Sequence, residues 1–412
     1  MNREESELLV RVGPSTPMGR FMRRYWIPAL LSDQIGAPDC DPVRVKLLGE
    51  RLVAFRDSAG QPGLLGEQCP HRTASLFFGR NEAGGLRCVY HGWKFDVEGA
   101  CLEMPSEPRG GEFRHQVRAK AYPCIERGGI VWTYMGPADC KPEFPDLEWV
   151  SVAPQNRYVS RHVQECNWLQ ALEGGFDSSH LGFLHIGSIK GVPNIIPSRY
   201  EVMPTDFGAV VGTGRELDDG NVEWSANVML APFHKLIATT PLGSHVWVPI
   251  DDENTMLYSC DYNPDRPFTQ AELDYCASGL YTHTKNIPGT DRPIWNRDND
   301  YLIDRALQRS GDSYTGIASI GMQDCAIQES MGPIADRSLE NLGVSDMGIA
   351  KIRRFLLNAV RDHEAGGTPP GMNGASYRVR SARFRLPASA GFAGAVDQHV
   401  RQSARQSSGV SA

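Results

Sequence analysis

The sequence contains no run approaching the roughly 20 apolar residues that a membrane-spanning helix needs. Its start, MNREESELLVRVGPSTPMGRFMRRYW, has no basic stretch followed by an apolar run, so it does not resemble a secretory leader. We therefore expect a cytoplasmic protein with no membrane partner.

Paired cysteines, a basic stripe and a dinucleotide fingerprint are also missing. Of the ten cysteines, those outside two motifs described below show no paired spacing, which argues against a disulfide framework. The formal net charge is −7 with both signs mixed along the chain, so we expect no nucleic-acid partner. The sequence has no Gly-x-Gly-x-x-Gly motif, so it gives no indication of a dinucleotide-binding site of its own.

The length of 412 residues exceeds what one hydrophobic core usually supports, so we expect two domains. Short β-type runs separated by turn residues predict a small antiparallel β domain over 43–136, and the proline-rich segment 137–148 reads as a linker. Residues 149–385 mix helical and strand-like patterns, which predicts an α+β domain with an antiparallel sheet covered by helices. Residues 1–42 are expected to pack on this larger domain, and 386–412 to form a flexible tail.

Helical patterns in the larger domain lie around 165–186, 270–286, 294–309, 322–330 and 346–363. Strand-like runs are VEWSANVML, HVWVPI and TMLYSCDY. The clearest helix is 346–363, which has one apolar face and ends before Gly366-Gly367. We interpret it as a packing helix.

Two mixed cysteine–histidine pairs are the most informative motifs. They are Cys69-Pro70-His71 and, after sixteen intervening residues, Cys88-Val89-Tyr90-His91. Each pair offers one thiolate and one imidazole, which suits a [2Fe–2S] cluster in which two histidines replace two cysteines on one iron, the Rieske arrangement. The flanking residues extend the motifs to CPHR and CVYHGWKFD, which resemble the cluster-binding loops of Rieske proteins.

A Cys2His2 zinc site is the alternative interpretation of these four residues. Structural zinc ligands usually come as one pair of cysteines followed by one pair of histidines. Here both pairs are mixed, so the spacing favours the iron–sulfur cluster.

A second candidate metal site lies in the segment EGGFDSSHLGFLH at 173–185. We expect it to be helical, with Asp177 three residues before His180 and on the same face. His180 and His185 are five residues apart, about 140° around a helix, so the helix must loosen near His185 for both to bind one ion. Two histidines and a carboxylate with open positions form the facial triad of non-heme Fe(II) oxygenases, where O2 enters. The alternative is a pair of buried core histidines.

The chain from about residue 8 to 385 resembles the Rieske non-heme iron oxygenases, specifically the α (terminal oxygenase) subunits of the phthalate 4,5-dioxygenase-like branch of aromatic ring-hydroxylating oxygenases. The resemblance is carried by RRYW at 23–26, CPHR, CVYHGWKFD, the Asp-x-x-His-x4-His segment and GMQDCAIQESMGPI at 321–334. It implies an N-terminal all-β Rieske [2Fe–2S] domain followed by a catalytic domain with a mononuclear iron.

The resemblance implies that Asp324 is the third iron ligand beside His180 and His185. Asp336 and Asp346 are rival carboxylates, which we interpret as a loop residue and a helix cap.

Asp177 then matches the family's bridging aspartate. In that role it accepts hydrogen bonds from His180 and from the partner subunit's His91, which couples the two metal centres. Gly174 is a departure, because some relatives have an asparagine there. A water could take its place, or the pocket could be wider, and Asn167 is the candidate for the nearest polar group.

The resemblance further implies a homotrimer, or a hexamer built from trimers, that receives electrons from a flavin and iron–sulfur reductase or a ferredoxin. The expected reaction is cis-dihydroxylation of an aromatic carboxylate, and O-demethylation of a methoxylated aromatic acid is the alternative within the family. A Rieske electron carrier without oxygenase chemistry is the alternative of another class. A substrate carboxylate needs a cation, and the candidates are Lys190, Arg199, Arg215 and Lys235.

Overall fold

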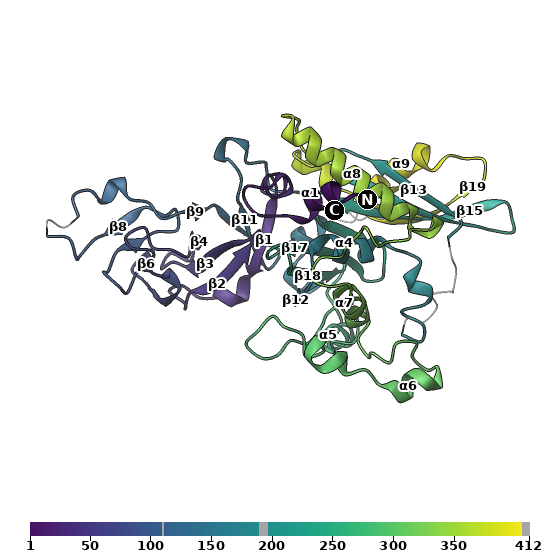
Figure 1. Cartoon of the computed structure of the whole chain (residues 1–412), viewed down its shortest axis with the longest axis horizontal. Coiled ribbons are helices and arrows are strands. Elements are labelled where there is room, and N and C mark those ends of the chain that lie inside the picture. The colour runs from purple at the N-terminus through teal and green to yellow at the C-terminus, as the bar shows by residue number, and fades with distance from the viewer. Residues whose placement is uncertain (109–110, 189–196, 406–412) are drawn as a thin grey trace. The chain divides into compact units, whose positions relative to one another are not determined.

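The computed structural model describes residues 1–108, 111–188 and 197–405, and Figure 1 shows the whole chain. The chain divides into two compact units. The N-terminal unit comprises Val12–Ser15 and Gly19–Pro142, and the C-terminal unit comprises Met1–Arg11, Thr16–Met18 and the chain from Glu143 onward. The expected segment 1–42 is therefore divided between the units. Its apolar run Trp26–Leu31 becomes a strand of the N-terminal unit because five of its six side chains are buried there.

Strands dominate the N-terminal unit, as its short β-type runs predict. They are β1 (Trp26–Leu31), β2 (Val43–Leu47), β3 (Glu50–Arg56), β4 (Pro62–Gly66), β5 (Arg80–Glu82), β6 (Gly85–Arg87), β7 (Lys94–Phe95), β8 (Cys101–Glu103), β9 (Ala121–Tyr122), β10 (Cys124–Arg127) and β11 (Ile130–Tyr134). Within the described residues they form three antiparallel sheets, ordered β1-β11-β10, β2-β3-β4-β9 and β5-β6-β7-β8.

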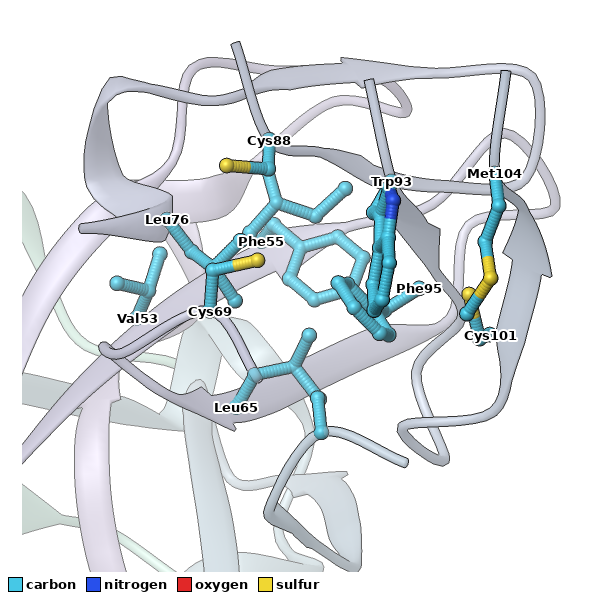
Figure 2. Packing of buried hydrophobic residues seen from close by; sticks show 12 residues of the cluster. Val53, Phe55, Leu65, Cys69, Leu76, Cys88, Trp93, Phe95, Cys101 and Met104 are labelled. Atoms are coloured by element: carbon cyan, nitrogen blue, oxygen red, sulfur yellow. The ribbon is translucent and has the colours of Figure 1, made fainter. Parts of the chain in front are cut away.

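A hydrophobic core lies between β3, β4 and the sheet that begins with β5. Figure 2 shows Phe55, Leu65, Phe95 and Trp93 packed together, with Cys69 and Cys88 at the margin of the same cluster. Because both cysteine side chains are almost fully buried, the candidate cluster loops are anchored on this core.

The C-terminal unit is built on one antiparallel sheet. Its strands are β12 (Arg157–Gln164), β13 (Arg199–Pro204), β14 (Gly208–Glu216), β15 (Asn221–Leu230), β16 (His234–Ile237), β17 (Leu242–Pro249), β18 (Thr255–Tyr262) and β19 (Ala382–Pro387). The order is β12-β18-β17-β16-β15-β14-β13, with β19 also paired to β15. The strands predicted from VEWSANVML, HVWVPI and TMLYSCDY correspond to β15, β17 and β18, which confirms them.

Helices cover both faces of this sheet. The α-helices of the described chain are α1 (Arg3–Val10), α2 (Pro17–Met22), α3 (Glu148–Ser151), α4 (Trp168–Phe176), α5 (Gln270–Ala277), α6 (Arg305–Ser310), α7 (Ile320–Ser330), α8 (Met347–Glu364) and α9 (Phe392–Arg405). Gly348 of α8 lies against Val211, whereas Phe392 of α9 lies against the next residue, Gly212, where any Cβ would clash with its ring. Since successive strand residues point to opposite faces, α8 and α9 cover opposite faces.

Two expected helices are shorter in the structure. The pattern around 270–286 gives α5, which ends at Ala277 because Gly279 adopts a left-handed backbone, with φ of 76°. The pattern around 294–309 is broken at Asp300 and Tyr301, whose φ values are 49° and 53°, so that only α6 is α-helical.

The prediction of a flexible tail over 386–412 is wrong for the described part of that segment. Leu386 and Pro387 are the last two residues of β19, and Phe392–Arg405 form α9. Phe392, Val396 and Val400 recur at every fourth position and are buried, so they give this polar segment an apolar stripe that packs on the sheet. In the described part of the chain, no helix is both long and apolar enough to cross a membrane.

Candidate metal centres

The two cysteine–histidine loops of the N-terminal unit have the same backbone geometry. The N–H of Cys69 donates to the carbonyl of Ala74, and that of Cys88 donates to the carbonyl of Trp93, five residues on in each case. The residues four positions after the cysteines, Thr73 and Gly92, donate back to the cysteine carbonyls and both have left-handed backbones, with φ of 57° and 78°. The sequence therefore builds two matching tight loops.

The imidazoles of His71 and His91 converge between these loops. Their ring centroids are 4.4 Å apart, and His71 stacks on Trp93 at 4.3 Å with an interplanar angle of 13°. The Nδ1 atom of each histidine is buried and has no hydrogen-bond partner in the described part of the chain. Burying an unpartnered polar atom is costly, and two such nitrogens beside two buried cysteines fit a cluster held by two thiolates and two imidazoles.

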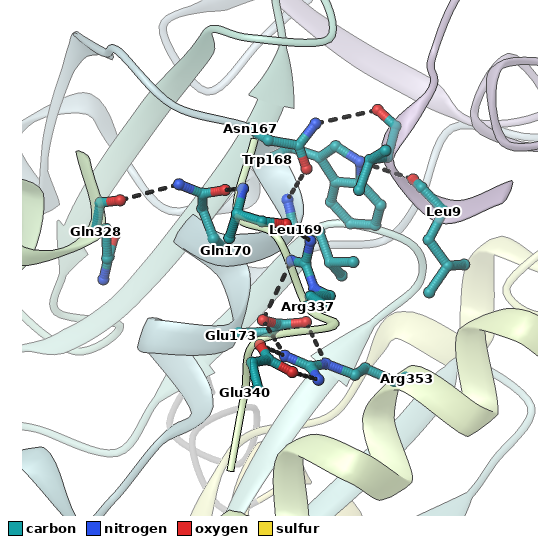
Figure 3. Close-up of polar contacts among 12 residues, drawn as sticks. Leu9, Asn167, Trp168, Leu169, Gln170, Glu173, Gln328, Arg337, Glu340 and Arg353 are labelled. Atoms are coloured by element: carbon teal, nitrogen blue, oxygen red, sulfur yellow. Dashed lines mark hydrogen bonds and ion pairs between the residues drawn. The ribbon is translucent and has the colours of Figure 1, made fainter. Parts of the chain in front are cut away.

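The helix α4 positions the second candidate site, and polar contacts fix it at several points (Figure 3). The Asn167 side chain caps the helix by accepting from the N–H of Leu169 and donates to the carbonyls of Val10 and Asp252. Near the other end, Glu173 is buried and pairs with Arg353 at 2.7 Å and with Arg337 at 3.3 Å. A buried carboxylate with two guanidinium partners holds the end of the helix in place.

The segment beyond α4 is not helical, contrary to the expectation for 165–186. The helix ends at Phe176, and the Asp177 side chain accepts a hydrogen bond from the N–H of Ser179 at 2.7 Å. Aspartate favours such local turns over a continuing helix. His180 then begins a short 3-10 helix, His180–Gly182, and His185 follows in a turn. The turns let the two imidazoles converge, which a regular helix would have prevented.

Three potential ligands meet where this segment approaches α7. The Nε2 atoms of His180 and His185 each lie 3.5 Å from Oδ1 of Asp324, and one ligand atom from each residue falls within 4.8 Å of the others. His185 is almost fully buried, while His180 and Asp324 are partly exposed. Two imidazoles and one carboxylate on one side of an ion leave coordination positions open, which is the donor set of a facial triad.

Each imidazole has a partner on its other nitrogen. Nδ1 of His180 is 3.4 Å from Oδ2 of Asp177. Nδ1 of His185 is 2.7 Å from Oε1 of Gln323, whose amide nitrogen donates to Ser188 and to the carbonyl of Ile317. Acceptors at Nδ1 keep the proton there and direct the Nε2 lone pairs toward the shared ion. Sequence reasoning missed Gln323, although it directly precedes Asp324.

We expect Gln323→Leu to weaken iron binding roughly 10- to 100-fold, the usual cost of losing a group that orients a metal-ligating histidine. The measurement is iron retained during dialysis against graded chelator. Gln323→Glu keeps an acceptor at the same distance and should retain more iron than Gln323→Leu. Equal retention by Gln323→Leu and the wild type would show that Gln323 does not orient His185.

A cavity of about 410 Å³ opens from the candidate triad. Its wall includes the apolar residues Ile237, Trp247 and Leu257 and the cations Arg215, Lys235 and Arg383. A cavity of this size, mainly apolar with a few charged groups, suits a small aromatic ligand.

The candidate cations have different environments. Lys235 donates to the carbonyl of Gly175 and lies 5.4 Å from the centre of the Phe176 ring. Arg215 pairs with Glu223 at 2.6 Å. Arg383, which sequence reasoning missed, makes no ion pair within the described residues.

None of the other three residues predicted to bind the substrate lines the cavity in the described part of the chain. Arg199 pairs with Glu216 at the surface outside the cavity, Lys190 lies outside the described residues, and Asn167 serves as the helix cap rather than as a cavity group.

Gln328 occupies the space next to Gly174. A Cβ at position 174 would lie 2.0 Å from the Gln328 amide nitrogen, so neither a water nor a wider pocket replaces the missing side chain. Gln328 is four residues after Asp324 on α7 and also lines the cavity. That spacing places both side chains on one helix face, and it is the signal that could have identified Gln328.

Burial and nearby charges together shift the pKa values of three side chains. Burial raises the pKa of Asp177, but the hydrogen bond and charge of His180 outweigh burial and leave it lowered. Burial lowers the pKa of His185, but Asp324 more than offsets this and the pKa is raised. Burial lowers the pKa of Lys235 to about 8, against the opposing charges of Asp324 and Asp177. At neutral pH, Asp177 is therefore an acceptor and Lys235 is mostly charged.

Comparisons with known proteins show the family to which the chain belongs. A Rieske [2Fe–2S] domain matches residues 25–123, and a LigXa C-terminal domain like model matches residues 133–197 and 221–385. The oxygenase subunit of 3-chlorobenzoate-3,4-dioxygenase from Comamonas testosteroni is 39% identical over 96% of this chain and 98% of its own. The chain belongs to the Rieske oxygenase family. The oxygenase subunit of phthalate 4,5-dioxygenase from Pseudomonas putida is 37% identical, over 93% of this chain and 91% of its own.

A solved structure supports the Rieske oxygenase fold. The terminal oxygenase of carbazole 1,9a-dioxygenase from Nocardioides aromaticivorans IC177 has a TM-score of 0.59 at 17% identity, covering 87% of this chain and 97% of that one. The predicted resemblance and fold class are therefore confirmed. A Rieske oxygenase also carries a mononuclear iron, so the electron carrier without oxygenase chemistry is excluded as the alternative.

Proposed function

We propose that this Rieske oxygenase is the terminal oxygenase component of a multicomponent system that cis-dihydroxylates an aromatic carboxylate. The observation that carries the proposal is the group His180, His185 and Asp324 at the wall of a cavity that also holds Lys235. The cavity offers apolar walls for a ring, a cation for a carboxylate and a metal-ligand set with open positions. The aromatic carboxylates in the names of its relatives, 3-chlorobenzoate and phthalate, have this chemistry.

Both metal groups have a complete set of ligands in the chain. Cys69, His71, Cys88 and His91 would hold the [2Fe–2S] cluster, and His180, His185 and Asp324 would hold the mononuclear iron. When bound, these groups supply one-electron transfer and O2 activation. The protein's own residues fix both imidazole tautomers at the iron and place the substrate ring in a mainly apolar cavity. NADH would supply the electrons through a separate reductase.

Asp177 is proposed as the electron bridge between the two centres. One of its carboxylate oxygens lies 3.4 Å from Nδ1 of His180, and its side chain is 29% exposed, so it can still accept from a neighbouring molecule. In a homotrimer, or in a hexamer built from trimers, that donor would be the partner subunit's His91. The assembly would receive electrons from a flavin and iron–sulfur reductase or from a ferredoxin.

Lys235 is the proposed partner of the substrate carboxylate. Lys235 lies on the cavity wall near the candidate triad, and its ammonium group donates a hydrogen bond to the neutral carbonyl of Gly175. Arg215 is already neutralised by Glu223. Arg383 also lines the cavity but lies on an exposed part of β19, so it is the second choice.

We expect Lys235→Met to raise KM for an aromatic carboxylate at least ~30-fold, because truncating one partner of a buried charge pair costs about 2–5 kcal/mol. Steady-state kinetics should show little change for an uncharged ring analogue, which separates carboxylate binding from a packing role. Arg199→Met, which removes a surface cation outside the cavity, is the control. An unchanged KM for the carboxylate in Lys235→Met would exclude this role.

The same pairing predicts a pH dependence. The pKa of Lys235 is lowered to about 8, so its charge is present below that pH and is lost above it. His245, Asp177 and Asp324 are the titratable groups that interact with it. KM for the carboxylate should therefore rise as the pH increases through about 8, and this rise should be absent in Lys235→Met.

The experiment that tests the proposed function is substrate-stimulated oxygen uptake. Phthalate, 3-chlorobenzoate and methoxylated benzoates would be supplied with a matching reductase and NADH, and products would be analysed after reaction under ¹⁸O2. Cis-dihydroxylation incorporates both oxygen atoms into the product ring, whereas O-demethylation releases formaldehyde. Dependence of uptake on an aromatic acid supports the proposal, and equal uptake with and without every acid tested contradicts it.

A further inference from the structure

The C-terminal unit contains a second cluster of potential metal ligands that the oxygenase reaction does not use. Among the described residues, two groups bring three histidine, cysteine or carboxylate ligand atoms within 4.8 Å of one another. One is the candidate iron triad, and the other is Asp261 on β18, Cys276 on α5 and His283 in the segment after α5. We call the second group the Asp-Cys-His cluster.

The Asp-Cys-His cluster is buried and incompletely hydrogen-bonded. His283 is 1% exposed, Cys276 is 4% exposed and Asp261 is 9% exposed. Nε2 of His283 lies 3.4 Å from Oδ2 of Asp261 but makes no hydrogen bond within the described residues. Burying an imidazole nitrogen that makes no hydrogen bond costs free energy, even when a carboxylate lies nearby. A third group that binds both the nitrogen and the carboxylate would remove this cost.

The other ring nitrogen of His283 already has a partner. Nδ1 of His283 lies 2.6 Å from Oγ of Ser160 on β12. If Nδ1 donates to this hydroxyl, Nε2 presents a lone pair toward the Asp261 carboxylate and the Cys276 sulfur. Three electron-rich atoms facing one another repel, and a cation between them removes the repulsion. A hydrogen-bonded group on the far nitrogen is also the usual way in which proteins orient a metal-ligating histidine.

We propose that Asp261, Cys276 and His283 bind a zinc ion. Thiolate, imidazole and carboxylate together are a zinc donor set, and the thiolate disfavours magnesium and calcium. Bonds of about 2.0–2.2 Å in a tetrahedral site place a nitrogen and an oxygen ligand roughly 3.3–3.5 Å apart. The 3.4 Å between His283 and Asp261 agrees with that spacing. A small exogenous ligand such as water completes the fourth position.

The position of the site indicates a structural role. Cys276 and His283 flank Tyr281 and Thr282, which line the cavity of the candidate oxygenase site. The carbonyl of Tyr281 also accepts a hydrogen bond from the N–H of Gly321, at 3.1 Å, in the first turn of α7. Zinc would therefore tie this segment to β18 and hold both the cavity wall and the beginning of the helix that carries Asp324.

The test uses the full chain with His180→Ala, so that the mononuclear site does not bind the added metal. This parent would be dialysed against zinc with a competing chelator, and its zinc and iron content measured. We expect about one zinc per chain in the parent and a loss of at least ~10-fold in retained zinc after adding Cys276→Ser. Cys166→Ser removes another buried cysteine of the same unit and is the control; it should retain zinc.

The cluster absorption spectrum reports whether each variant is folded and whether the Rieske site is occupied by iron rather than zinc. If Cys276→Ser does not fold, zinc-edge X-ray absorption of the parent decides the question. One sulfur ligand at about 2.3 Å is expected. No zinc in the parent, zinc retained fully by Cys276→Ser, or a coordination shell without sulfur would each overturn the proposal. None of these results depends on the oxygenase substrate.

Discussion

Replacing His180 or His185 by alanine should remove the mononuclear iron and reduce product formation by at least ~100-fold. This loss is larger than the usual loss of activity when a residue that only orients a metal ligand is removed. Each imidazole places its Nε2 atom 3.5 Å from Asp324, and two remaining ligands do not make a facial triad. The cluster should be unaffected, because its four proposed ligands lie in the N-terminal unit.

The measurement is iron per chain together with the visible and paramagnetic spectra of the cluster. Iron should fall from about three to about two per chain, the number that a [2Fe–2S] cluster holds, and the spectra should not change. His115→Ala, which alters an exposed histidine elsewhere, is the control and should keep full iron and activity. Full turnover in either triad variant would disprove the ligand assignment.

Asp177→Asn should leave both metal centres loaded and yet nearly abolish turnover. A carboxylate accepts from an imidazole N–H on each side, whereas an amide presents a donor on one side, so one of the two hydrogen bonds is lost or reversed. We expect electron transfer to fail without unfolding. The readouts are iron content and the rate at which the pre-reduced cluster is re-oxidised when substrate and O2 are added.

Three roles of Asp177 give three distinct results. A direct iron ligand would lose the mononuclear iron when changed to asparagine, and a carboxylate with only a local structural role would give a variant with normal re-oxidation. Only a bridge leaves both centres loaded but uncoupled. Asp336→Asn is a suitable control, because Asp336 is a loop carboxylate that accepts from Ser338 and has no contact with the triad.

The sequence predicted those parts of the molecule that local spacing controls. The residues Cys69, His71, Cys88 and His91 lie within two short loops, so their spacing alone indicated the cluster chemistry. Likewise, β15, β17 and β18 followed from runs of β-branched and aromatic residues. In both cases the information lies in neighbouring residues.

Features that depend on distant contacts could not be predicted in the same way. The helix expected through residue 186 ends at Phe176 because the Asp177 side chain forms a turn, and this competition is not visible in the periodicity. Gln328 fills the space beside Gly174 only because α4 and α7 pack together. Arg383 reaches the cavity wall because β19 pairs with β15, more than 150 residues earlier in the sequence.

The central claim is that two metal centres cooperate in oxidising a substrate held in the cavity. The most direct test is a single turnover of the chemically reduced, fully loaded oxygenase, mixed with O2 and an aromatic carboxylate identified by oxygen uptake, without any reductase. We predict that product forms and that the cluster is re-oxidised in step with it, with both processes requiring substrate and both being lost in His180→Ala. Re-oxidation of the cluster at the same rate without substrate, or product formation in His180→Ala, would contradict the account.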